Sequence, residues 1–159
     1  MSISDMIVVM KLGVVQQIGK PQEVYDDPKN LFVAKFLGTP PINVLDGCVK
    51  DGKVCIGEDT VLEVRGVADQ EVVIGIRPEG FELDENGALH CSLSNVEVMG
   101  RDVSIVSTNP ASQNPVIRSI IDADNKVDLG ARTVSYNIKP HKLFLFNKET
   151  EERIWFDLP

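Results

Sequence analysis

The spacing of hydrophobic positions divides the chain into a short N-terminal part and a longer C-terminal part. Residues 7–18 read "IVVMKLGVVQQI", which predicts two short strands around a Lys-Leu-Gly turn because both halves are rich in β-branched residues. Pro21 suits the first position of a helix and Pro28 cannot continue one, so we expect about one and a half helical turns between them.

A second short helix is predicted directly afterwards. Asp27 is placed to cap it, with Pro28 at its first position. Its hydrophobic residues form a one-sided stripe, which consists of Phe32, Val33, Phe36 and Leu37. Gly38 is a natural end for this helix, and "GTPPIN" after it reads as an extended linker.

Beyond the linker the hydrophobic period becomes two, which is the period of β-strands. Asp51-Gly52 predicts a tight hairpin, and Val72, Ile74 and Ile76 are expected on one face of a strand within residues 71–83. Between Leu93 and Val96 the hydrophobic positions change from odd to even numbers, which is the effect of a β-bulge.

Further short strands are predicted to the end of the chain, about nine in all, with turn signals every eight to twelve residues or so. Strands this short and this frequent predict a mainly β fold, namely a closed or nearly closed barrel of which the OB-fold is one type.

Composition and charge exclude several classes of function. The hydrophobic content of 43% and charged content of 25% are typical of a globular protein, and the apolar runs are far too short to span a membrane. The N-terminus has no signal-peptide pattern, so we expect a cytoplasmic protein. Residues 1–38 are neutral overall, so the net charge of −8 belongs to residues 39–159. Such an acidic part repels nucleic-acid phosphates, and we expect no nucleic-acid partner.

Three cysteines agree with a reducing compartment. If Asp51-Gly52 is a two-residue turn, Cys48 and Cys55 lie opposite each other in a hydrogen-bonded pair, whose side chains are wider apart than a disulfide prefers. We therefore favour two reduced thiols over a disulfide. Neither a Cys-x-x-Cys pair nor a histidine at ligand spacing is present, so no metal site is predicted.

One stretch looks like a nucleotide site and fails on inspection. Gly13, Gly19 and Lys20 resemble a phosphate-binding loop, but five residues separate the glycines where four are needed. Pro21 also stands where the loop requires a Ser or Thr hydroxyl. His90 and His141 have no partners at catalytic spacing, so we expect neither catalytic nor cofactor-binding residues in this chain.

The N-terminal residues resemble the end of the nucleotide-binding domain in ATPase subunits of ABC-type sugar importers, the maltose, multiple-sugar and glycerol-phosphate group. The family pattern is a strand, a glycine turn, then "Q-x-G-x-P-x-E-x-Y" and "P-x-N-x-F-V-A-x-F-x-G-x-P". The matching residues are Ile7 to Met10, Gly13, Gln17, Gly19, Pro21, Glu23, Tyr25, Pro28, Asn30, Phe32 to Ala34, Phe36, Gly38, Pro40 and Asn43.

The rest of the chain is similar to the regulatory domain of the same family, the TOBE/MOP-type OB-fold. "VVIGIRPEGFEL" resembles its "G-I-R-P-E-D" signature, and "LFNKETEERI" resembles its closing "F-D-x-x-T-G-x-R-I". The chain departs from the pattern at Gly80, Asn147 and Glu151. The resemblance therefore implies two parts: residues 1–38, a hairpin-and-helix remnant of the nucleotide-binding domain, and residues 39–159, the TOBE/OB-type domain.

This resemblance implies a regulatory and dimerisation role and no enzyme activity in this chain. The family's ATP-contacting motifs are absent, so Met1 is expected to be an internal methionine or an engineered start, and the chain a C-terminal fragment. ATP and Mg²⁺ would belong to the parent subunit. The implied partners are a second copy, the permease subunits and a cytoplasmic regulatory protein, on the inner face of the membrane.

Two groups of residues are candidates for these roles. Arg77, Pro78 and Glu79 form either a structural turn or a contact for a regulator, and the structural alternative is favoured because such side chains satisfy nearby backbone groups. The candidate interface consists of Phe32, Phe36 and Trp155. An alternative function is the sensing of a small oxyanion or sugar, although the "SARN" motif of oxyanion-binding relatives is absent and the negative charge opposes it.

Overall fold

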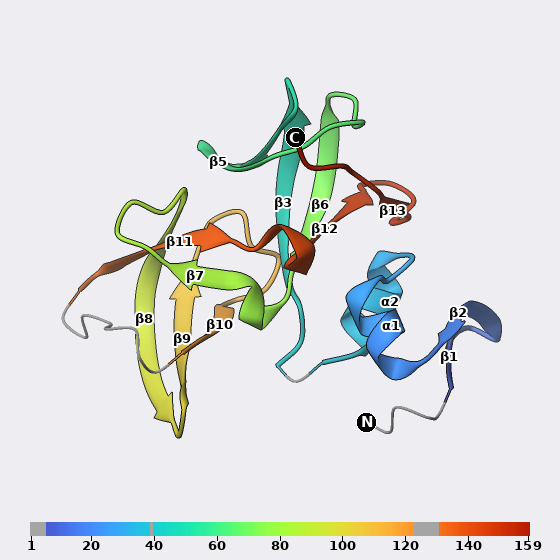
Figure 1. Ribbon diagram of the computed structural model, residues 1–159, viewed down its shortest axis with the longest axis horizontal. Coiled ribbons are helices and arrows are strands. Elements are labelled where there is room, and N and C mark those ends of the chain that lie inside the picture. Colours follow the sequence, from blue (N-terminus) through green and yellow to red (C-terminus); the bar gives the residue numbers. More distant parts are fainter. Residues whose placement is uncertain (1–5, 39, 123–130) are drawn as a thin grey trace.

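The computed structural model describes residues 6–38, 40–122 and 131–159, and Figure 1 shows their arrangement. Predictions about Met1 and Thr39 lie outside these residues. The N-terminal elements are β1 (Ile7–Lys11), β2 (Val14–Gly19), α1 (Pro21–Asp26) and α2 (Leu31–Phe36). The strands that follow are β3 (Asn43–Lys50), β4 (Lys53–Ile56), β5 (Asp59–Glu63), β6 (Gln70–Ile76), β7 (Phe81–Leu83), β8 (Leu89–Met99), β9 (Asp102–Thr108), β10 (Ile117–Asp122), β11 (Thr133–Ile138), β12 (Leu143–Asn147) and β13 (Arg153–Ile154).

The N-terminal elements pack around a small core of their own. The predicted hairpin is confirmed, because β1 and β2 pair antiparallel with Val8 opposite Ile18. Both helices lie against this hairpin, where Val9, Val24 and Val33 are buried together. In Figure 1 the hairpin lies on the right, and the helices lie between it and the larger sheets.

The prediction that Asp27 caps the second helix is wrong. Asp27 ends α1 with a backbone bond to the Glu23 carbonyl, and α2 begins after Asn30, whose Oδ1 accepts from the Val33 N–H at 2.9 Å. The reason is tertiary: the Lys29 carbonyl accepts from the Arg153 N–H, and the Leu31 N–H donates to the Glu151 carbonyl. These bonds hold the chain extended up to Asn30 and move the cap by three residues.

A six-stranded sheet has the order β13-β12-β6-β3-β4-β5. The hairpin predicted on Asp51-Gly52 is confirmed, since Lys50 pairs with Lys53 and both turn residues have positive φ, 52° and 74°. Positive φ at both central positions is the conformation of a type I′ turn, which suits Asp-Gly. Cys48 lies opposite Cys55 as expected, and both are free thiols.

A five-stranded sheet has the order β10-β9-β8-β11-β7. The bulge predicted in β8 is confirmed by a register shift between Leu93 and Asn95. The strand expected within residues 71–83 is β6, which ends at Ile76, and the turn favoured at Arg77-Pro78-Glu79 is present as a 3₁₀ turn at Pro78–Gly80. Proline lacks the N–H that a ladder needs, so the chain leaves one sheet with β6 and enters the other with β7.

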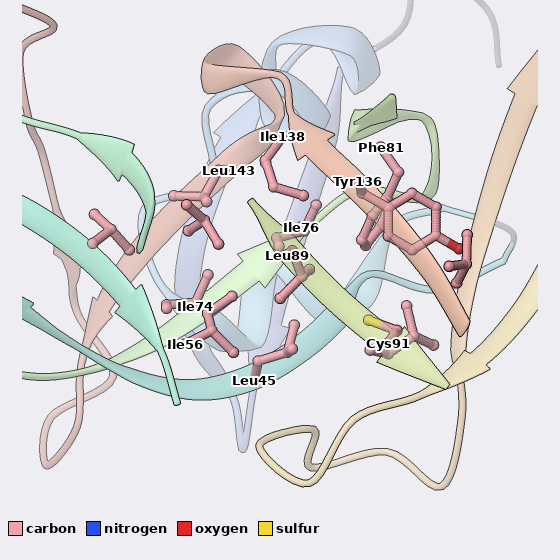
Figure 2. Close-up of a cluster of buried hydrophobic side chains, with 14 of the residues drawn as sticks. Leu45, Ile56, Ile74, Ile76, Phe81, Leu89, Cys91, Tyr136, Ile138 and Leu143 are labelled. Carbon is pink, nitrogen blue, oxygen red and sulfur yellow. The ribbon is translucent and has the colours of Figure 1, made fainter. Parts of the chain in front are cut away.

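One hydrophobic core joins the two larger sheets. Figure 2 shows Leu45, Ile56 and Ile74 from the six-stranded sheet facing Leu89 and Tyr136 from the five-stranded sheet. Strands β10 and β7, at opposite ends of the five-stranded sheet, approach within 8 Å between Cα atoms, so this sheet is nearly closed. The predicted mainly β, OB-like barrel fold is confirmed.

No helix in the part of the chain that the structure describes is both long enough and apolar enough to cross a bilayer.

Candidate functional site

Arg77 is a fully buried charged side chain at the end of β6. Its Nη1 donates to the carbonyl oxygens of Ala34 at 2.8 Å and Leu37 at 3.0 Å, and its Nη2 donates to that of Tyr25 at 2.8 Å. These carbonyl groups belong to the last turns or caps of α1 and α2, where intrahelical partners are missing and a cation is favourable. One arginine therefore binds carbonyl groups at the C-terminal ends of both helices.

Aromatic rings surround the same guanidinium group. The Cζ atom of Arg77 lies 3.9 Å from the centroid of the Tyr25 ring and 5.6 Å from that of Phe144. Burial lowers the pKa of Arg77, while Tyr25, Glu79 and Asp26 oppose that change. The group still carries its charge at neutral pH, because the guanidinium group of arginine is not deprotonated in proteins.

Glu79 and Lys142 extend this arrangement to the surface. The Tyr25 hydroxyl donates to Glu79 Oε1, and Lys142 Nζ lies 3.5 Å from the same oxygen and 3.7 Å from a carboxylate oxygen of Asp26. Burial, and then the bond to Glu79, raise the pKa of Tyr25. Tyr25 is thus held by its ring, its hydroxyl and its carbonyl group.

Arg153 makes a second attachment to the same N-terminal elements. Its Nη1 donates to the Pro28 carbonyl at 2.8 Å and to Asp27 Oδ1 at 2.9 Å. Its Cζ lies 4.7 Å from the centroid of Phe144 and 5.3 Å from that of Trp155. Burial lowers the pKa of Arg153, and the neighbouring Asp27 opposes that change. We call Arg77, Arg153 and the carbonyl groups that they bind the arginine clamp.

Hydrophobic packing strengthens the clamp. Leu31 and Ala34 of α2 are buried in one cluster with Ile42, which precedes β3, and with residues of the six-stranded sheet, namely Val44, Val73, Phe144 and Phe146. Gly75 lies in the same region, and a Cβ atom there would stand 2.8 Å from Ile42 Cδ1 and 3.1 Å from Phe146 Cε2. Absence of a side chain at Gly75 therefore allows the close packing on this face.

The predicted motif Arg77, Pro78 and Glu79 is thus placed beside both helices, and its contacts are with this chain's own backbone and side chains. A contact with a regulator stays a prediction. Sequence reasoning missed Lys142 and Arg153 as members of the same arrangement, because they lie far along the chain from the helices that they hold.

The candidate interface residues differ in exposure. Phe36 and Trp155 are 57% and 58% exposed, whereas Phe32 is half-buried against the small N-terminal core. The Phe32 and Phe36 rings lie 6.3 Å apart. Their role in an interface stays a prediction.

A larger exposed hydrophobic surface lies on the β1–β2 hairpin. Seven of the eleven exposed large hydrophobic side chains in the described part of the chain belong to residues 6–18. Val8 pairs with Ile18 and Met10 pairs with Val15, so these four side chains share one face, and each is about half exposed. We call these four residues the hairpin face. A globular protein does not usually leave such a face in water.

Comparison with known proteins identifies relatives over nearly the whole chain, although no protein-family model matches it. The oligosaccharide import ATP-binding protein MsmX of Bacillus subtilis is 33% identical over an alignment of 171 positions, which covers 97% of this chain and 46% of MsmX. A glycerol-3-phosphate import ATP-binding protein of Jannaschia is 31% identical over 97% of this chain and 43% of its own length.

A shorter match is closer in sequence. The trehalose/maltose import ATP-binding protein MalK of Thermococcus litoralis is 48% identical over 89 residues, half of this chain and 24% of MalK. The chain spans less than half the length of these relatives. It is homologous to the ATP-binding subunits of ABC-type sugar importers, and this coverage is consistent with a C-terminal part of such a subunit.

Proposed function

We propose that this chain is the regulatory and dimerisation part of the ATPase subunit of an ABC-type sugar importer, which couples to ATP-driven carbohydrate uptake. In this proposal residues 1–38 are the remnant of the nucleotide-binding domain and residues 39–159 are the TOBE/OB-type domain. The observation that carries it is the arginine clamp, which attaches the helices of the first part to the sheets of the second.

The hairpin face gives this proposal its docking surface. Relatives extend well beyond the matched region, which is 24–46% of their length, and their names describe them as ATP-binding proteins. We assign the missing ATP-binding portion of the subunit as the occupant of the hairpin face. Val8, Met10, Val15 and Ile18 would then be buried as a sheet face normally is.

The clamp makes the proposed coupling mechanical. Motion of the ATP-binding portion would be passed through the hairpin and helices to the sheets, because Arg77 and Arg153 tie them together at several carbonyl groups. Two copies joined by their TOBE/OB-type domains would keep the ATP-binding portions at high effective concentration. A regulatory protein would act by favouring one state of the pair.

The other parts of the proposal follow from the importer relatives. The permease subunits would be partners through the ATP-binding portion, on the cytoplasmic face of the membrane. ATP and Mg²⁺ would bind in that portion, and the chain by itself would hydrolyse no ATP. Phe36 and Trp155 are candidates for the contact with the second copy or with a regulator.

A chimera tests this function. The matched portion of MsmX is replaced by this chain, and the purified chimera is assayed for ATP hydrolysis and, in cells without MsmX, for oligosaccharide uptake. We expect both activities, and their loss in a Val8→Asp, Ile18→Asp chimera. Val98→Asp is the matched control, since Val98 is an exposed valine on β8 outside the hairpin face.

The outcomes separate the parts of the proposal. An inactive parent chimera would contradict the function, and full activity of the double aspartate chimera would contradict docking through the hairpin face. ATP hydrolysis by the chain alone would contradict the assignment of the ATP site to the missing portion. A monomer in light scattering at high concentration would count against self-association through either part.

A further inference from the structure

Two thiols lie directly opposite each other on a strand pair away from the arginine clamp. Cys48 of β3 pairs with Cys55 of β4, and both are half-buried free thiols. Their neighbours Val49 and Val54 are buried in the core, so by alternation the two cysteines lie on the opposite face of the sheet. Opposite residues in an antiparallel pair have Cα atoms about 4.5–5.5 Å apart, within the range of about 4.4–6.8 Å that a disulfide spans.

Charged side chains surround the two thiols on this face of the sheet. Lys50 and Lys53 pair next to the thiols, and alternation places them on the same face. On β6, Glu71 is opposite Cys48, and Lys148 Nζ lies 3.1 Å from its carboxylate. From β5, Thr60 Oγ1 lies 3.7 Å from Cys55 Sγ. Glu63 of β5 lies opposite Lys53, so carboxylates flank this face as well, and the attraction of an anionic reagent depends on the two lysines that stand next to the thiols.

The surroundings of Cys48 also change its reactivity. Burial, and then the neighbouring Cys55, raise the pKa of Cys48, while Lys50 acts in the opposite direction. The thiolate is the reacting form, so the exchange at Cys48 becomes faster as the pH rises.

We propose that Cys48 and Cys55 form a redox-active dithiol that exchanges with anionic low-molecular-weight disulfides of the glutathione type. Cross-strand disulfides in hydrogen-bonded pairs depart from ideal geometry, and strained disulfides are the more easily reduced ones. The cross-link is therefore reversible, a labile modification and not a permanent structural bond.

The exchange has two balanced steps. The thiolate of one cysteine attacks a sulfur of the small disulfide, which breaks its S–S bond, forms a mixed disulfide and releases one small thiolate. The thiolate of the second cysteine then attacks the cysteine sulfur of this mixed disulfide, breaks the S–S bond of the mixed disulfide, forms the cross-link and releases the second small thiolate. The two cysteines lose two electrons, the small disulfide gains them, and the two protons pass to the released thiolates.

Oxidised glutathione serves as the probe. The reduced chain is incubated with it without oxygen, and intact mass and alkylation mapping are measured over time. We expect the mass to fall by two hydrogen atoms, with Cys48 joined to Cys55 and Cys91, which is buried, unmodified. A chain that remains reduced, or that ends as a stable glutathione adduct, would overturn the proposal.

Two sets of variants sharpen the test. Cys55→Ser has nothing to resolve the first adduct, so it should retain glutathione on Cys48; a fall in mass by two hydrogens in this variant would contradict the assignment. Lys50→Gln with Lys53→Gln should slow the reaction with glutathione disulfide about twofold more than the reaction with neutral hydroxyethyl disulfide, because both reactions lose the effect of Lys50 on the Cys48 thiol and only the first also loses the attraction of an anion. If the parent and the double lysine variant react with glutathione disulfide at equal rates, the role of the lysines is contradicted.

Discussion

Arg77 and Tyr25 are in contact across 52 residues of sequence: the guanidinium carbon lies 3.9 Å from the centroid of the phenol ring, and Nη2 donates to the Tyr25 carbonyl at 2.8 Å. One side chain thus binds both the ring and the backbone of the last turn of α1. The contact joins the two parts of the chain that the sequence distinguishes by hydrophobic period.

Removal of Arg77 tests how much the clamp contributes. We expect Arg77→Ala to lower the free energy of unfolding by about 3 kcal/mol or more, because three carbonyl groups lose a charged donor. The free energy of unfolding of Arg77→Lys should lie between those of the parent and Arg77→Ala, since one ammonium group does not reproduce the planar fork of the guanidinium group. Urea unfolding measures these values.

Arg101→Ala is the control for this experiment. Arg101 is exposed on the turn between β8 and β9, so its loss should change the free energy of unfolding by less than about 0.5 kcal/mol. Equal effects at the two arginines would show that Arg77 contributes through general charge and not through its contacts.

The phenol of Tyr25 should make stability depend on alkaline pH. Its pKa is higher in the folded chain than in the unfolded chain, so its contribution is complete below about pH 10 and falls as the pH rises above that value. Tyr25→Phe should therefore lose less stability than the parent between about pH 8 and about pH 11, as measured by denaturant unfolding.

Tyr136 does not confuse this comparison. Burial also raises the pKa of Tyr136, but that residue is present in both chains and its contribution cancels in the difference. The same loss of stability in both chains over this pH interval would contradict the assignment to Tyr25.

Arg153 and Asp27 form an ion pair, and the two residues should contribute unequally to the free energy of unfolding. The Arg153 side chain is 9% exposed and the Asp27 side chain 66% exposed. Arg153→Ala should cost about 2 kcal/mol, because the Pro28 carbonyl also loses its donor. Asp27→Ala should cost less than about 1 kcal/mol, since an exposed carboxylate is well solvated.

A double-mutant cycle checks the link between them. In the Arg153→Ala background, the effect of Asp27→Ala should disappear, because its partner is gone. An Asp27→Ala effect that persists unchanged would mean that Asp27 acts through the end of α1 and not through Arg153.

Even the smallest side chain at position 75 should destabilise the fold. Gly75→Ala places a Cβ atom 2.8 Å from Ile42 Cδ1, and we expect a cost of about 1–3 kcal/mol from overpacking. Ile42→Val removes that Cδ1 atom, so the double variant should be more stable than the sum of the two single effects. Additive effects in urea unfolding would contradict the close approach.

Local features of this fold follow from the sequence alone. Asp51-Gly52 forms its turn because both residues accept positive φ. The bulge near Leu93 lies at the place where the alternation of hydrophobic positions changes phase. Each depends on residues within a few positions of one another, so the pattern of neighbours is sufficient to predict it.

The arginine clamp and the cap of α2 depend on contacts over long distances in the sequence. Asn30, and not Asp27, begins α2 because residues 29–31 bond with residues 151–153, and Arg77 serves helices 40–52 residues away. No local pattern contains these partners. The hydrophobic period determined which segments become strands and helices, whereas the packing of distant segments decided which carbonyl groups Arg77 and Arg153 bind, because an unpaired group must find its partner in space.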